Sequence, residues 1–143
     1  MDIPILEETS DYAVIVKPAG LIVHPPHEHF NSDSVVAWAR EKYPEIADVG
    51  DDQALRPGIV HRLDAPVSGV MLIARTSDFF THIKAQFEER TVLKEYTALV
   101  YDRVQRDEGD IDLPLQKGRE KTKVMPRGSE KDNARSKRAS THF

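Results

Sequence analysis

The sequence predicts an α+β fold, and three features support this class. Several short runs are rich in β-branched and aromatic residues, two longer segments carry apolar residues at helical spacing, and the predicted strands and helices do not alternate regularly. A length of 143 residues is enough for one domain with a buried core, and we expect residues 1–143 to form it.

The first part of the chain is predicted to contain short strands followed by a helix. Ile3–Glu8 and Tyr12–Lys17 have the composition of strands, and Leu21–Val23 is a further short extended piece. Ser32–Tyr43 is predicted as a helix because Ser32 or Asp33 can cap it and Pro44 lies just past its end. The residues expected on its inward face are Val35, Val36 and Ala39.

The middle of the chain is predicted to hold a polar loop, two strands and the clearest helix. Residues 46–57 are acidic and polar, which is typical of a loop. Gly58–Arg62 and Gly69–Arg75 are predicted as strands, the second of them buried because its apolar run is continuous. Ser77–Arg90 is predicted as a helix capped by Ser77. We assign to the core Trp38 and the stripe Phe80, Ile83 and Phe87.

The last part of the chain is predicted to be mainly extended. Val92–Val104 has the pattern of a long strand with apolar residues on both faces, and three shorter segments could be strands as well. These are Gly109–Leu115, Lys123–Pro126 and Ala139–Phe143.

Composition limits the classes of function. The chain has no cysteine, which excludes disulfides, thiolate metal sites and a cysteine nucleophile. No stretch approaches the ~20 apolar residues of a membrane span, and the N-terminus lacks the basic and apolar regions of a signal peptide. These features fit a cytoplasmic protein without a membrane partner.

Basic residues gather near the C-terminus although the whole chain carries a net charge of −4. The segment Lys117–Arg138 has a formal charge of +6, which leaves −10 on the remainder. Such a strip can engage phosphate groups while the acidic body stays soluble, but a charge run alone is more often a solvated loop. Its basic members are Lys117, Arg119, Lys121, Lys123, Arg127, Lys131, Arg135, Lys137 and Arg138.

Polar residues end one of the predicted strands. His61, Arg62 and Asp64 follow the apolar residues Ile59 and Val60 of this predicted strand, and a turn that contains Pro66 comes next. Side chains at the end of a buried strand are well held for a functional site. On spacing alone the same cluster is also typical of a surface ion pair.

Five blocks of the sequence, in order, resemble the RluA family of pseudouridine synthases, which isomerise uridine in RNA. The most specific block combines the His-Arg-Leu-Asp tetrad at 61–64 with Ser-Gly and an apolar strand that follow it. The match extends over nearly the whole chain. The blocks are Asp11–Gly20, Arg56–Arg75, Phe87–Val100, Asp112–Leu115 and Lys137–Phe143. The resemblance implies a mixed, mainly antiparallel sheet with flanking helices.

The resemblance also implies roles for individual residues. Asp64 corresponds to the catalytic aspartate, and Arg62 to the arginine that occupies or stabilises the space left by a flipped base. Tyr96 would stack on the uracil, and Lys94 would pair with a phosphate or a neighbouring carboxylate. His61 would fix the turn or contact RNA. No metal and no organic cofactor are expected, because the reaction involves neither a redox change nor group transfer.

The chain departs from the family pattern in three respects. Val67 stands where a polar residue, commonly Thr, is usual. We expect no separate RNA-binding domain before Met1, and the family continues beyond Phe143 for several strands. Those strands carry a basic partner for the catalytic aspartate and apolar residues of the uracil pocket, so we expect this chain to represent a C-terminally truncated catalytic domain.

Three functional interpretations follow. The favoured one is an RNA pseudouridine synthase that acts on ribosomal or transfer RNA, without an obligate protein partner and monomeric if the fold is complete. The second is a non-catalytic RNA-binding remnant of the same fold. The third is a small metal-binding protein that uses His24, His27 and His29, since three nearby imidazoles can bind zinc or nickel.

Overall fold

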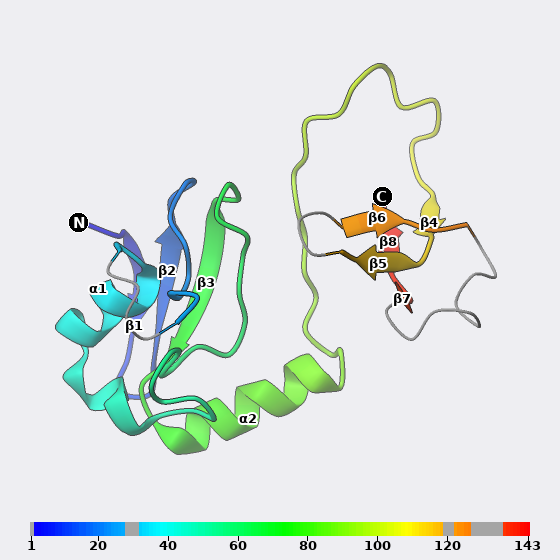
Figure 1. The fold of residues 1–143 in the computed structure, drawn as a ribbon. Coiled ribbons are helices and arrows are strands. Elements are labelled where there is room, and N and C mark those ends of the chain that lie inside the picture. The colour runs from blue at the N-terminus through cyan, green and yellow to red at the C-terminus, as the bar shows by residue number, and fades with distance from the viewer. Residues whose placement is uncertain (1, 28–31, 119–121, 127–135) are drawn as a thin grey trace. The chain divides into compact units, whose positions relative to one another are not determined.

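The computed structural model describes residues 2–27, 32–118, 122–126 and 136–143. The chain divides into two compact units, Met1–Glu95 and Tyr96–Phe143, which Figure 1 shows as ribbons. The expectation that residues 1–143 form one catalytic domain stays a prediction.

An antiparallel sheet organises the first unit. It contains β1 (Ile5–Glu8), β2 (Tyr12–Lys17) and β3 (Gly69–Ala74) in the order β1-β2-β3, with β2 in the middle (Figure 1). β2 and β3 are in continuous register from the pair Tyr12↔Ala74 to the pair Lys17↔Gly69. Alternate residues of β2 are buried, so one face of the sheet carries the core.

Helix α1 (Val35–Lys42) covers that face, and η1 (Pro44–Asp48) follows it directly. The three residues predicted to face inward are all buried. The cap is Ser34, whose hydroxyl accepts from the amide of Ala37 at 3.1 Å, and not Ser32 or Asp33. Ser34 replaces the predicted caps because its hydroxyl stands three residues before the amide that it satisfies.

Helix α2 (Ser77–Glu88) begins after the end of β3. Its cap is Thr76 and not Ser77, because the hydroxyl of Thr76 accepts from the amide of Phe79. The helix stops at Glu88, two residues before the predicted end, and Arg90 takes a left-handed conformation with φ of 59°. Of the predicted stripe, Phe80 is buried and the other two members are partly buried.

The second unit contains short antiparallel strands, and two of them divide one predicted strand. β4 (Asp110–Asp112) lies within the predicted segment 109–115, and β5 (Leu115–Lys117) begins at the last residue of that segment. Pro114 stands between the two strands. β4 pairs with β8 (Ser140–His142), and β5 lies between β6 (Thr122–Val124) and β7 (Ser136–Lys137). Residues 119–121 and 127–135 of the predicted basic strip lie outside the described residues.

The strand predicted over Gly58–Arg62 is wrong apart from one bridge, Ile59↔Ile73. The backbone amide of Ala74 donates to the carbonyl of Gly58 at 2.9 Å, but the ladder goes no further. The next amide on the same edge, that of Leu72, donates to the ring of His61 instead of to a backbone carbonyl.

The long strand predicted over Val92–Val104 is also wrong, since that segment is neither helix nor strand. Its large apolar residues are exposed, including Leu99 and Tyr101 at full exposure. A strand needs a neighbour for its backbone hydrogen bonds, and no described strand pairs with this segment.

Within the described ranges, the antiparallel sheets and two α-helices give the predicted α+β class. No helix within the described residues is long and apolar enough to cross a membrane.

Candidate functional site

Asp64 lies on a turn between the Ile59 bridge and β3. The backbone amide of Val67 donates to the carbonyl of Asp64 at 3.0 Å, which closes the turn. Leu63 is buried and Val67 packs against the same core, whereas the side chain of Asp64 is exposed. The carboxylate is therefore open to a ligand while the backbone on both sides of it is held by apolar packing.

Lys17 ties this turn to the end of β2. Its side chain is fully buried, and its ammonium donates to the carbonyls of Pro18 at 3.0 Å, Leu21 at 2.7 Å and Ala65 at 3.1 Å. The amide of Gly20 donates to the same Ala65 carbonyl at 2.7 Å. All three ammonium protons thus have acceptors, and the residue after Asp64 is bonded from two directions.

Burial and the charge of Asp64 act in opposite directions on the pKa of Lys17. Burial lowers the pKa of the Lys17 ammonium, because the charged form loses its hydration, and the negative charge of Asp64 acts in the opposite direction. The aspartate therefore has a cation behind its turn. The sequence analysis matched the block Asp11–Gly20, which contains Lys17, to the family but gave Lys17 no role.

His61 is held in a neutral form inside the loop. Its Nε2 accepts a hydrogen bond from the amide of Leu72 at 3.0 Å, and its ring stacks on Phe87 with centroids 4.9 Å apart. Burial lowers the pKa of His61, and the positive charge of Lys94 lowers it further. Because Nε2 accepts a hydrogen bond from an amide of β3 and the ring stacks on Phe87 of α2, His61 fixes its loop to both elements.

Arg62 lies between His61, which is bonded to β3, and the buried Leu63. Its side chain is exposed, and its Nη1 lies 3.3 Å from Nε2 of His24. The other ring nitrogen of His24 lies 2.9 Å from the carbonyl of Pro25. The structure thus brings together three of the five predicted site residues, His61, Arg62 and Asp64, on one loop and adds His24 to them.

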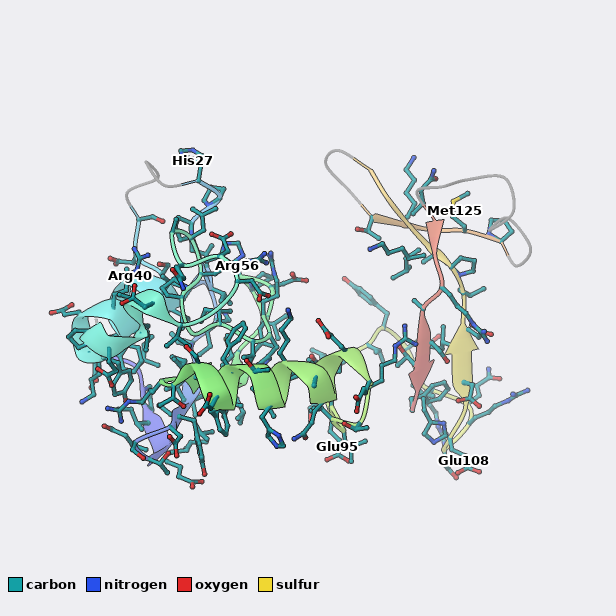
Figure 2. The ribbon with its side chains drawn as sticks, turned by 90° about the horizontal axis from the view of Figure 1, so that it is seen from below. His27, Arg40, Arg56, Glu95, Glu108 and Met125 are labelled. Atoms are coloured by element: carbon teal, nitrogen blue, oxygen red, sulfur yellow. The ribbon has the colours of Figure 1, made fainter. Side chains whose placement is uncertain are left out.

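The remaining two predicted site residues follow α2. Lys94 is exposed and close enough for its charge to act on His61. Tyr96 belongs to the second unit and is 66% exposed. Figure 2 labels Glu95, the residue between them, near the last turns of α2. Stacking of Tyr96 on a base beside Asp64 stays a prediction.

The histidine cluster and the basic strip are described only in part. His27 lies on the loop that leads away from the sheet (Figure 2), and His29 is outside the described residues. Within the described part of the chain, no three His, Asp or Glu side chains come together as metal ligands. In the basic strip, Lys123, Lys137 and Arg138 are exposed, and Arg138 lies 3.5 Å from the carboxylate of Asp112.

A model of one protein family, described as RNA pseudouridylate synthase, matches residues 11–143. Among curated proteins, the uncharacterized RNA pseudouridine synthase YlyB of Bacillus subtilis is 33% identical over 143 residues, which is 100% of this chain and 45% of the relative. The ribosomal large subunit pseudouridine synthase D of Zymomonas mobilis is 33% identical over 99% of this chain and 44% of its own length. The chain spans less than half the length of these relatives.

Two solved structures have a similar fold. Human RNA pseudouridylate synthase domain containing 4 superposes with a TM-score of 0.66 at 23% identity, over 97% of this chain and 52% of that one. Human RNA pseudouridylate synthase domain containing 1 superposes with a TM-score of 0.70 at 18% identity, over 99% and 51% of the two chains. At these identities the similarity establishes the fold.

Proposed function

The chain belongs to the family of RNA pseudouridylate synthases, and from this premise we propose that it isomerises uridine to pseudouridine in RNA with Asp64 as the catalytic carboxylate. The observation that carries the proposal is the placement of Asp64. Its side chain is exposed, yet the next residue is bonded to the ammonium of Lys17 and the amide of Gly20. A reacting group needs this combination of access and fixed position.

The reaction suits a single carboxylate. It breaks the bond between the sugar and N1 of uracil, turns the base and joins the sugar to C5, so that a proton leaves C5 and another is gained at N1. Asp64 can attack the sugar or the base covalently, or it can remove a proton from the sugar. Each route uses the ionised carboxylate, and none of them requires an oxidant, a reductant or a group donor.

The neighbouring residues are assigned to RNA binding. The target base must leave its stack to reach Asp64, and the exposed guanidinium of Arg62 is suited to fill the vacated space or to bind phosphate. Tyr96 would stack on the flipped uracil, while Lys94 would contact the RNA backbone. His61 supports these groups through its bonds within the loop.

Ribosomal or transfer RNA is the proposed substrate class, and the cytoplasm is the proposed location. The name of the Zymomonas relative specifies the ribosomal large subunit. A relative from Vibrio parahaemolyticus, 34% identical over 78% of this chain and 40% of its own length, is named a dual-specificity RNA pseudouridine synthase. We propose no obligate protein partner and a monomer for the complete fold.

The decisive experiment compares pseudouridine formation in unmodified RNA by the wild-type chain, Asp64→Asn and Asp107→Asn. The asparagine at 64 keeps the size of the side chain but cannot act as a nucleophile or base, so we expect no product. Asp107 is an exposed aspartate of the second unit and serves as the matched control. Equal product from Asp64→Asn and wild type would refute the catalytic assignment. RNA binding by a folded wild-type chain that forms no product would favour the non-catalytic RNA-binding function.

A further inference from the structure

The ring of His24 is bonded at both of its nitrogens. Nδ1 lies 2.9 Å from the carbonyl oxygen of Pro25, and Nε2 lies 3.3 Å from Nη1 of Arg62. A carbonyl oxygen can only accept a hydrogen bond, so Nδ1 must carry the proton. A guanidinium can only donate, so Nε2 must offer its lone pair. Both partners therefore select the same neutral tautomer of His24.

The backbone before His24 is attached to the start of helix α1. Val23 is buried, and its carbonyl accepts from the amide of Val36 at 2.9 Å. The carbonyl of Ile22 accepts from the amide of Val35 at 3.0 Å. These bonds also satisfy amides of the first helical turn, which have no partner inside the helix. His24 thus extends from a fixed base toward the loop of Asp64.

Arg62 has a fixed backbone but a long exposed side chain. His61 on one side is bonded to β3, and Leu63 on the other side is in the core. An exposed arginine normally samples many rotamers, and ordering it when a ligand binds has an entropic cost. A partner that orders the guanidinium beforehand reduces this cost.

We propose that His24 is a positioning residue that holds the guanidinium of Arg62 in the orientation in which it contacts RNA. This inference rests on the proposed function, because the purpose of the bond is to prepare Arg62 for the RNA. His24 does not touch the reacting atoms; it acts through Arg62. The contact joins residues 38 positions apart in the sequence.

The test uses substitutions that separate the shape of the ring from its acceptor. His24→Phe keeps a flat ring and removes the acceptor. His24→Gln places a carboxamide oxygen near the position of Nε2 and can still accept from Arg62. His82→Phe, at an exposed histidine of α2, controls for the replacement itself. Each variant is made in the full chain, alone and together with Arg62→Ala, and its unfolding midpoint is compared with that of the wild type.

Binding is measured with a fluorescent hairpin RNA that has uridines in its loop. We expect His24→Phe to weaken binding about fivefold, as the loss of one hydrogen bond would, and His24→Gln to stay within about twofold of wild type. In the Arg62→Ala background, His24→Phe should have no further effect. Equal losses from His24→Phe with and without Arg62 would overturn the inference, as would normal binding by His24→Phe.

The same chain gives a readout that does not depend on RNA. A long-range ¹H–¹⁵N correlation spectrum identifies which nitrogen of His24 is protonated, and we expect Nδ1. A proton on Nε2, or an ¹⁵N shift of Nε2 that is unchanged in Arg62→Ala, would contradict the geometry. A wild-type chain with the expected tautomer that binds no RNA would refute the proposed function and with it the role of the bond, whereas RNA binding without coupling refutes the inference alone.

Discussion

Replacing Lys17 with methionine tests whether the buried ammonium holds the turn of Asp64. Methionine has nearly the same length and volume but no charge and no donor. The substitution removes three hydrogen bonds at once, to the carbonyls of Pro18, Leu21 and Ala65. The carbonyl of Ala65 keeps its bond from the amide of Gly20, so the turn loses one of its two attachments.

The expected magnitude is the difference between two large effects. Each hydrogen bond from a charged donor contributes about 1.5–3 kcal/mol, so the loss of three is substantial. The substitution also relieves the cost of keeping an ammonium away from water, which is several kcal/mol for a buried ion. That cost is visible in the lowered pKa of Lys17. The free energy of unfolding should therefore fall by about 1–3 kcal/mol.

Urea unfolding followed by the fluorescence of Trp38 measures this change. Trp38 is the one tryptophan of the chain and packs against the core of the first unit, so it reports on the part that contains Lys17. Lys42→Met, at an exposed lysine of α1, is the control and should change the free energy by no more than about 0.5 kcal/mol. If Lys17→Met were as stable as the wild type, the three hydrogen bonds would give no net stabilisation, and the expectation that Lys17 stabilises the turn would be refuted.

Two further predictions concern Gly58 and His61, which lie close to Asp64 in the sequence. Gly58→Ala should destabilise the first unit by more than about 2 kcal/mol, because φ is 69° and a Cβ would lie 2.6 Å from the carbonyl oxygen of Ala74. Gly20 has φ of 88°, but no atom lies within 4 Å of an added Cβ, so Gly20→Ala should have only the backbone cost of about 1 kcal/mol. If the two variants had equal midpoints in thermal unfolding, the contact with Ala74 would not be the cause of the loss at Gly58. Burial lowers the pKa of His61 below its ordinary value of 6.5, so in acid the unfolded chain binds a proton more readily than the folded one. The stability that is present above pH 6.5 should therefore fall as the pH drops below this value. Urea midpoints across that range should show a smaller slope for His61→Gln, and an unchanged slope would exclude this residue as the source.

Local signals were sufficient for much of the first unit. β2 has the predicted bounds, and β3 ends one residue before the prediction. Both strands have continuous apolar or β-branched runs bounded by turn residues, which is a signal that does not depend on distant parts of the chain. The helix caps were missed because several hydroxyl or carboxylate residues stand in a row, and only the backbone geometry decides which of them meets an amide.

The candidate site was predictable where it is contiguous in sequence. The tetrad that ends in Asp64 identified its loop, but the contacts that hold the loop come from elsewhere. Lys17 reaches a carbonyl 48 residues away, and His24 reaches a guanidinium 38 residues away. A signal for Lys17 did exist, since it follows Ala13 and Ile15 at the spacing of inward-facing residues in β2. A lysine at such a position must find acceptors within the fold.

The segment 92–104 shows why strand propensity alone was misleading. Its apolar and aromatic residues suit a pleated sheet, but a strand is a property of a pair of segments, and the described residues provide it with no neighbour. Lys94 and Tyr96 are on this segment, so no strand pairing within the described residues holds the backbone from which they would contact RNA. Asp64, in contrast, is held by bonds inside the first unit. A substitution of Tyr96 therefore tests the proposed stacking on the base, whereas Asp64→Asn isolates the chemical step.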